Sequence, residues 1–301
     1  MNKNVELRLW RQFATLADEL HFGRAAQRLH MTQPPLTQAI AHLEQLLEVR
    51  LFDRTKRSVR LTKAGDAILP EVRDLILRAD GLPHRARAAA AGEVGRLRLA
   101  FVSTAGFALL PRWVRAFRDR YPEVGLELLE ATGDMQLKAF DRQEIDAGIM
   151  LHAPGFEPVG LERRPVALEP FVLAVPEQNP LASARLLRLE RVLAESLVVF
   201  PRRILPSLHD AVMGIYHAAG LSPVVAQEAI QMQTIVNLVS AGLGVAWVPQ
   251  SVTQFQRSGV VYRTLSAKQG ISAPLCETSL VWPTGPANPC VQRFLEVALA
   301  Q

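Results

Sequence analysis

The chain has few of the features that mark exported, membrane-spanning or metal-binding proteins. It contains only two cysteines, Cys276 and Cys290, and their spacing is not that of a metal site. Buried free thiols are the expected state, with a disulfide or redox pair as the alternative. The sequence has no apolar run of about 18 residues, and the N-terminal MNKNVELRLW is not an apolar signal segment. We therefore expect a cytoplasmic protein without membrane spans or metal.

Catalytic signatures are missing as well. The seven histidines are dispersed, and the sequence contains no G-x-S-x-G, H-E-x-x-H or phosphate-loop motif. The sequence thus predicts no catalytic residues and no cofactor, and it favours a function other than that of an enzyme.

The charge is concentrated at one end of the chain. A length of 301 residues, 49% of them apolar and 21% charged, is ordinary for a globular protein of two or more domains. Residues 1–91 contain 15 Lys and Arg against 10 Asp and Glu, whereas the remaining residues contain 19 of each. The whole net charge of +5 therefore belongs to the N-terminal part, which indicates a nucleic-acid partner there.

One helix in this part has a packing face and a polar face. Leu36, Ile40, Leu43 and Leu47 recur at helical spacing, while Gln33, Thr37, Gln38, Ala41 and His42 lie elsewhere on the helix. Thr32 can cap its start, and the two prolines that follow lie in the first turn, where a missing N–H costs little.

The residues before this helix complete a helix-turn-helix pattern. Ala25, Ala26 and Leu29 predict a short helix with small residues, and residues 30–31 predict the turn. Apolar spacing predicts another helix over residues 5–20. DNA binding is the functional interpretation, and an ordinary helical hairpin in a core is the alternative.

A basic hairpin follows. Residues 49–52 and 59–62 are short β-prone runs that predict a two-stranded wing. Between Arg50 and Lys63, six cationic residues face Asp53 as the single acid. Such a patch suits the phosphate backbone, although a solvated charged loop is the alternative. The residues predicted to contact DNA are Thr32, Gln33, Pro34, Thr37, Gln38, His42, Arg54, Lys56 and Arg57.

The segment from Leu9 to Gly65 resembles the DNA-binding domain of LysR-type transcriptional regulators, most closely the members that sense metabolites of aromatic catabolism. The match includes Ala25-Ala26, Gln33-Pro34, Leu43-Glu44, the LFDR of residues 51–54 and the L-T-x-A-G of residues 61–65. Two positions depart from the family pattern. Glu48 occupies the place of a helix-ending glycine, and Gln38 occupies a place where arginine is common.

A long helix is expected next, over residues 66–91, after a DNA-binding domain of residues 1–65. Ile68, Val72, Leu75 and Ala79 have helical spacing, but Gly81-Leu82-Pro83 predicts a kink or break. The resemblance implies that this helix pairs with its twin in a homodimer or homotetramer. Double-stranded operator DNA and a small-molecule effector are the other implied partners, and RNA polymerase is a candidate.

Strand and helix patterns alternate from residue 92 to the end, which predicts parallel sheets covered by helices. The family resemblance continues here in E-I-D-A-G-I at residues 144–149 and A-G-L-G-V-A-W-V-P at residues 241–249. It implies a multidomain fold: an α-helical winged helix-turn-helix, a linker helix and a periplasmic-binding-protein-like α/β effector domain. Its two subdomains would be residues 92–166 with 268–301, and residues 167–267.

Ligands of open α/β sheets bind beyond the carboxyl ends of strands, near helix N-termini. Six residues at such places form the candidate effector site, namely Ser103, Thr104, Thr132, Phe200, Pro201 and Arg202. In the family, hydroxyls at the positions of Ser103 and Thr132 contact the inducer. An aromatic or dicarboxylic acid is the implied effector, whereas plain helix capping is the alternative for the hydroxyls.

Two other functions are alternatives for a chain with these domains, namely an enzyme and a transport component. An enzyme fused to a DNA-binding domain would turn over a small molecule, and no catalytic set supports it. A solute-binding transport component would need an export signal and would not need a basic winged module. Both sequence features favour the ligand-responsive regulator.

Overall fold

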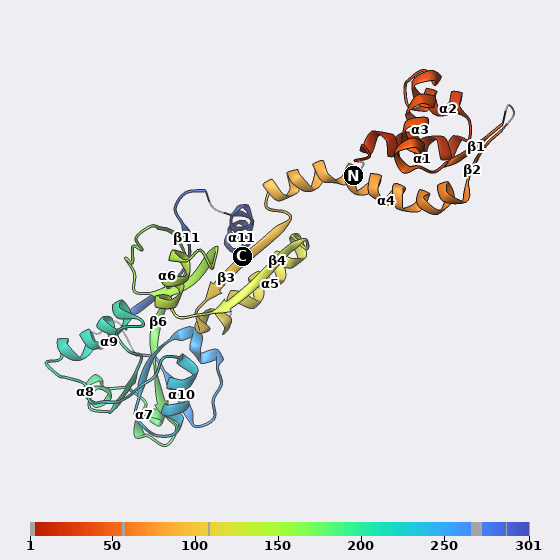
Figure 1. Cartoon of the computed structure of the whole chain (residues 1–301). Helices are drawn as coiled ribbons and strands as arrows, with labels where there is room; N and C mark the ends of the chain where they lie inside the picture. Colours follow the sequence, from red (N-terminus) through yellow and green to blue (C-terminus); the bar gives the residue numbers. More distant parts are fainter. Residues whose placement is uncertain (1–3, 56–57, 108, 266–272, 287, 301) are drawn as a thin grey trace. The chain divides into compact units, whose positions relative to one another are not determined.

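The computed structural model of the chain describes residues 4–55, 58–107, 109–265, 273–286 and 288–300. They fold into two compact units, Met1–Arg87 and Ala88–Gln301. Figure 1 shows the course of the chain through both units. Within the described ranges, no helix is both long enough and apolar enough to cross a membrane.

The first unit consists of helices and one small hairpin. In chain order its elements are α1 (Leu7–Glu19), α2 (Phe22–Arg28), α3 (Gln33–Leu47), β1 (Phe52–Arg54), β2 (Val59–Leu61) and α4 (Lys63–Ala90), which continues beyond the unit. β1 and β2 pair antiparallel, with Phe52 opposite Leu61. The predicted winged helix-turn-helix is therefore confirmed.

The start of α3 differs in one respect from the expectation. Thr32 is the extended residue before the helix, but among the described residues its hydroxyl accepts no hydrogen bond from the first turn. The reason is local, because a capping side chain bonds the second or third N–H of a helix, and here both positions are proline. The predicted capping bond of Thr32 is thus wrong, whereas the first-turn place of Pro34 and Pro35 is confirmed.

The end of α3 is made by an unusual residue. Glu48 adopts a left-handed conformation, with φ of 57° and ψ of 25°, and terminates the helix. Glycine is the usual residue in this conformation, because it has no Cβ to meet the preceding carbonyl. The departure of Glu48 from the family pattern therefore leaves the helix end in place.

Three apolar residues attach α3 to the first unit. Leu36, Ile40 and Leu43 are each 0% exposed, and they share a cluster with Phe13 and Leu16 of α1. Full burial of one such side chain stabilises the folded state by about 1.5–3 kcal/mol. This packing fixes one face of α3 and leaves the polar face outward.

Helix α4 is continuous over its 28 residues. A kink or break was predicted at residues 81–83; the break is wrong, because the helix passes through Pro83 and also through Pro70, whereas the kink stays a prediction. A proline removes one N–H and costs about 3 kcal/mol in a helix interior, but turns on either side keep their hydrogen bonds.

The second unit begins with β3 and ends with α11. Its elements are β3 (Gly95–Phe101), η1 (Ser103–Phe107), α5 (Leu109–Arg120), β4 (Val124–Glu130), α6 (Gly133–Asp141), β5 (Ala147–His152), β6 (Leu161–Pro176), α7 (Pro180–Ser183), α8 (Leu189–Leu193), β7 (Leu197–Val199), α9 (Pro206–Ala218), β8 (Val225–Glu228), α10 (Met232–Ser240), β9 (Ala246–Pro249), η2 (Gln250–Gln254), β10 (Val260–Arg263), β11 (Leu275–Pro283) and α11 (Pro289–Leu299).

The predicted parallel pairing holds for part of this unit. β3 lies between β4 and β5 and runs parallel to both, and β7 runs parallel to β8. However, β11 pairs antiparallel with β5 and β6, and β6 pairs antiparallel with β9 and β10. The expectation of parallel sheets is therefore confirmed only in part, because local alternation of strands and helices does not reveal a strand that pairs in the opposite direction.

Strand β6 connects two sheets. Its first part, residues 161–170, pairs with β11, and residues 171–176 pair with β9 and β10. The subdomain boundary expected at residues 166 and 167 falls within β6, and the second one, at 267 and 268, lies outside the described residues.

Both sequence motifs of this unit have local structural roles. Asp146 accepts hydrogen bonds from the backbone N–H of Arg98 at 2.8 Å and from its guanidinium at 2.7 Å. Burial works to raise the pKa of Asp146, but these hydrogen bonds outweigh it and the pKa lies below its ordinary value. Gly244 has a φ of 152°, and a Cβ there would lie 2.1 Å from the Ser196 carbonyl oxygen.

Gly65, in the first turn of α4, provides a test of the first unit. A Cβ at this position would lie 2.3 Å from the carbonyl oxygen of Leu51, which is backbone and cannot rotate away. We expect Gly65→Ala to destabilise the protein by more than about 2 kcal/mol in urea unfolding. Gly81→Ala, in the same helix with no described atom within 4 Å of its Cβ, is the control. It should stabilise by about 0.5–1 kcal/mol, and equal effects of both substitutions would contradict this packing.

Candidate functional site

The predicted DNA-contacting residues of α3 share its outward face. Gln33, Pro34, Gln38 and His42 are exposed, and Thr32 is exposed just before the helix. Thr37 is half-buried, and its hydroxyl donates a hydrogen bond to the carbonyl oxygen of Gln33 at 3.1 Å. The structure therefore brings all six residues together on a surface formed by one helix and its first turn.

Glu44 joins this helix to the wing. One carboxylate oxygen accepts hydrogen bonds from the backbone N–H groups of Leu51 and Phe52, at 2.9 and 3.0 Å. The other oxygen pairs with the Arg54 guanidinium at 2.7 Å. The sequence motif contained Glu44, but its role was missed, because its three donors lie seven to ten residues away along the chain.

The wing carries the basic patch. The Arg54 side chain is 31% exposed, and its guanidinium lies 5.2 Å from the centre of the Phe22 ring. Arg50, Arg60 and Lys63 are exposed and form no ion pair within the described residues. Lys56 and Arg57, two of the predicted contacts, lie outside the described residues.

The second unit contains a cleft at the predicted strand ends. Its volume is about 370 Å³, including the part open to solvent. The lining residues are Val102, Ser103, Thr104, Ala131, Thr132, Gly133 and Leu151 on one side and Ile204, Leu205, Ile230, Gln231 and Met232 on the other.

Polar groups in this cleft have properties suited to an anionic ligand. The N-termini of α6 and α10 reach it at Thr132 and Gln231, and neither residue caps its helix with a side chain in the described structure. Unpaired N–H groups at helix N-termini attract negative charge. The Thr132 hydroxyl instead donates to the Asp134 carboxylate at 2.5 Å.

Thr104 is the least satisfied polar residue of the cleft. It is 6% exposed, and within the described residues its hydroxyl has no hydrogen-bond partner. Leaving a buried hydroxyl unpaired costs about 1–3 kcal/mol. A ligand oxygen in the cleft would remove that cost.

Phe200, Pro201 and Arg202 do not line the cleft. Phe200 is fully buried, and the Pro201 carbonyl accepts a hydrogen bond from Ile204, which does line it. Arg202 is exposed and forms a two-pronged ion pair with Asp210, at 2.7 and 2.8 Å, whose hydrogen bonds lower the Asp210 pKa.

Nine lining residues were missed: Val102, Ala131, Gly133 and Leu151 beside the predicted hydroxyls, and Ile204, Leu205, Ile230, Gln231 and Met232 on the opposite side. Gln231 precedes α10 just as Thr132 precedes α6. This strand-to-helix position was the available signal.

Other chemistry is not supported by the described residues. They contain no group of three His, Cys, Asp or Glu side chains that could hold a metal ion. Cys276 and Cys290 are buried free thiols, and burial raises the pKa of both above the ordinary value. A high pKa keeps a thiol protonated and unreactive.

Comparison with known proteins agrees with this geometry. Residues 7–66 match the family described as bacterial regulatory helix-turn-helix protein, lysR family, and residues 90–301 match the LysR substrate binding domain. The chain is 43% identical to the HTH-type transcriptional regulator IlvR of Caulobacter vibrioides, covering 97% of each chain. It is 35% identical to AlsR of Bacillus subtilis, covering 99% of this chain and 96% of that protein.

A solved structure is similar over the same length. Full-length CbnR complexed with its target DNA has a TM-score of 0.82 and 28% identity, with 98% of this chain and 99% of that chain covered. Helix-turn-helix, linker helix and α/β substrate-binding domain together define a DNA-binding transcriptional regulator and not an enzyme. The chain belongs to the LysR family.

The Glu44 junction can be tested by removing its carboxylate. Glu44→Ala leaves two buried backbone N–H groups without their acceptor, so we expect a loss of about 1–3 kcal/mol in unfolding free energy. The exposed neighbour Gln45 serves as the control, and Gln45→Ala should change stability by less than about 0.5 kcal/mol. A Glu44→Ala protein as stable as the control would refute this role.

Proposed function

We propose that this regulator binds operator DNA as a homodimer or homotetramer and that a small organic acid controls it. A single helix in the major groove reads few base pairs, so two winged modules over spaced half-sites supply affinity and symmetry. Binding to a bacterial operator would place the protein in the cytoplasm. RNA polymerase is a candidate partner at the promoter.

The DNA contacts divide into two kinds. We assign base reading to the outward face of α3, with Gln33, Pro34, Thr37, Gln38 and His42 in or near the groove. Amide and imidazole side chains can donate to and accept from base edges, which supports this assignment.

Backbone binding is assigned to the wing residues Arg54, Lys56 and Arg57, and to Thr32 at the start of α3. A guanidinium binds a phosphate through two parallel hydrogen bonds and carries no base preference of its own. Because Glu44 already holds Arg54, that guanidinium meets the phosphate in a preset orientation.

The effector is assigned to the cleft of the second unit. The observation that carries this proposal is the unpaired Thr104 hydroxyl in a cleft that two helix N-termini also line. Ser103, Thr104 and Thr132 would bind a carboxylate, and the apolar lining would hold a small apolar body. An aromatic or dicarboxylic acid has this chemistry. Phe200, Pro201 and Arg202 would act indirectly, by shaping the segment that presents Ile204.

Ligand binding would act on the width of this cleft, since residues of both walls would contact the ligand. A ligand shifts a conformational equilibrium only as far as it binds one state better than the other. The proposed signal is therefore a change in the separation of the cleft walls.

The proposal is tested by titrating the full chain with aromatic acids, dicarboxylic acids and their neutral amides while DNA binding is followed. We expect some acids to bind and to change the DNA footprint, and their amides to bind at least tenfold more weakly. Equal affinity of acid and amide, or no effect of either on DNA binding, would rule out control by an anionic effector.

Two substitutions separate backbone binding from base reading. Arg54→Ala should weaken binding to all DNA sequences and reduce the slope of log K against log salt by about 0.9, the value for one phosphate contact. Gln38→Ala should change the preferred sequence at a cost of about 1–3 kcal/mol per base read and leave that slope unchanged. Identical salt slopes for wild type and Arg54→Ala would refute the phosphate assignment.

Thr104→Val is expected to change stability and effector binding in opposite directions. Replacing the unpaired hydroxyl with a methyl of similar size should stabilise the ligand-free protein by about 1 kcal/mol. The same change should weaken binding of the effector and remove its thermal stabilisation. Melting curves with and without ligand distinguish this result from a general destabilisation of the fold, since destabilisation would lower the melting temperature in both conditions.

A further inference from the structure

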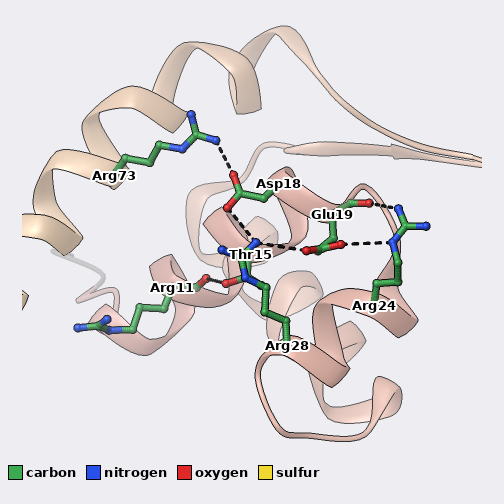
Figure 2. A network of polar contacts seen from close by, with 7 residues as sticks. All are labelled: Arg11, Thr15, Asp18, Glu19, Arg24, Arg28 and Arg73. Atoms are coloured by element: carbon green, nitrogen blue, oxygen red, sulfur yellow. Dashed lines mark hydrogen bonds and ion pairs between the residues drawn. The ribbon is translucent and has the colours of Figure 1, made fainter.

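Two ion pairs of opposite polarity connect α1 with the linker helix α4 inside the first unit. Near one end, both guanidinium nitrogens of Arg11 on α1 pair with the Asp80 carboxylate on α4, the first at 3.0 Å. Near the other end the charges are exchanged, because Asp18 of α1 pairs with Arg73 of α4 at 2.5 Å. Figure 2 shows this second pair.

The spacing of the four residues matches on the two helices. Arg11 and Asp18 are seven residues apart on α1, and Arg73 and Asp80 are seven residues apart on α4. Seven residues are nearly two turns, so each couple lies on one face and spans about 10.5 Å along its helix. The earlier residue of one helix pairs with the later residue of the other, so the two helices run antiparallel at this joint.

This charge pattern disfavours other registers. If α4 slid by seven residues along α1, Arg73 would face Arg11 or Asp80 would face Asp18. If α4 ran in the opposite direction, both like pairs would form at once. Like charges at contact distance repel. Among the observed register, the shifted registers and the reversed helix, the charge pattern therefore favours the observed antiparallel register.

Apolar packing holds the two helices together. Leu69 and Val72 of α4 are buried in the same cluster as Phe13 and Ala17 of α1. Close packing already favours one fit between the helices. The charged residues at the rim add a repulsion in the other registers that apolar contacts do not provide.

Asp18 also links the joint to the helix-turn-helix. It accepts a second ion pair from Arg28 of α2 at 3.4 Å, and Glu19 pairs with Arg28 and Arg24 of α2 at 3.2 and 3.3 Å. Figure 2 shows these side chains converging on the end of α1. The orientation of α4 is thus tied to the helix that packs beside α3.

We propose that the Arg11–Asp80 and Asp18–Arg73 ion pairs position the linker helix: they fix the register of α4 on α1 and so set the half-site separation that the dimer prefers on DNA. The inference rests on the proposed pairing of two winged modules over spaced half-sites. These side chains act through the direction of α4 and do not contact bases themselves.

The expected effect on affinity is modest, whereas the effect on spacing is specific. The Arg11 and Asp80 side chains are 40% and 53% exposed, and those of Asp18 and Arg73 are 32% and 57% exposed. Exposed pairs of this kind change an equilibrium by about two- to fivefold. A structural contact without a positioning role would lower affinity equally at every half-site separation.

The experiment uses the full chain and DNA selected by the wild-type protein from a random-sequence pool. The selected site is rebuilt with one to six base pairs inserted or removed between its halves, and affinity is measured for each separation. Arg11→Asp and Asp80→Arg should each reduce affinity about two- to fivefold per protomer at the preferred separation. They should also flatten the dependence on separation, and the double variant with both exchanges should restore the wild-type profile.

The Asp74–Arg78 pair is the matched control. It has the same charges at 2.8 Å and is exposed, but both residues belong to α4 and hold no second helix. Asp74→Arg and Arg78→Asp should leave the preferred separation unchanged. Thermal unfolding of each variant checks that the first unit is folded.

Two results would overturn the inference. Single variants that retain the wild-type preference, or a folded double variant that fails to restore it, would show that charge does not set the register. A wild-type protein without any preferred separation would instead overturn the proposed paired binding, and this inference with it.

Discussion

The DNA-binding unit depends on one carboxylate that is shared between its helix and its wing. Glu44 is 14% exposed and accepts from two backbone N–H groups and one guanidinium. An ionised acceptor binds such donors about twice as strongly as a neutral one. A hairpin of two three-residue strands is too short to hold its own position. This contact therefore gives the wing a fixed place beside α3 and sets the orientation of Arg54.

Much of the first unit could be predicted from its sequence, because the informative contacts are local. The spacing of Leu36, Ile40 and Leu43 gave the buried face of α3, and the proline pair marked its first turn. The same prolines also removed the N–H groups that Thr32 was expected to cap. This could have been predicted from the sequence, because proline has no backbone N–H. Whether the helix continues through Pro83 depends on the local cost of the proline against the hydrogen bonds of the neighbouring turns. Residue spacing alone does not reveal this balance.

Less of the second unit could be predicted, because its decisive contacts join distant segments. Ser103, Thr104 and Thr132 were placed at the cleft by their position after strands. Prediction of the opposite wall, formed by residues 204–205 and 230–232, would have required knowledge of how the two sheets face each other. That arrangement follows from β6 and β11, whose antiparallel pairing is set by residues more than a hundred positions apart.

The position of β11 near the end of the chain also affects how the protein folds as it leaves the ribosome. β5 pairs with β3 on one side and with β11 on the other, so its second edge lacks a partner until residues 275–283 have been synthesised. During that interval an apolar strand edge is available to other chains. We therefore expect the nascent protein to need protection by chaperones, and slower translation before β11 to increase aggregation.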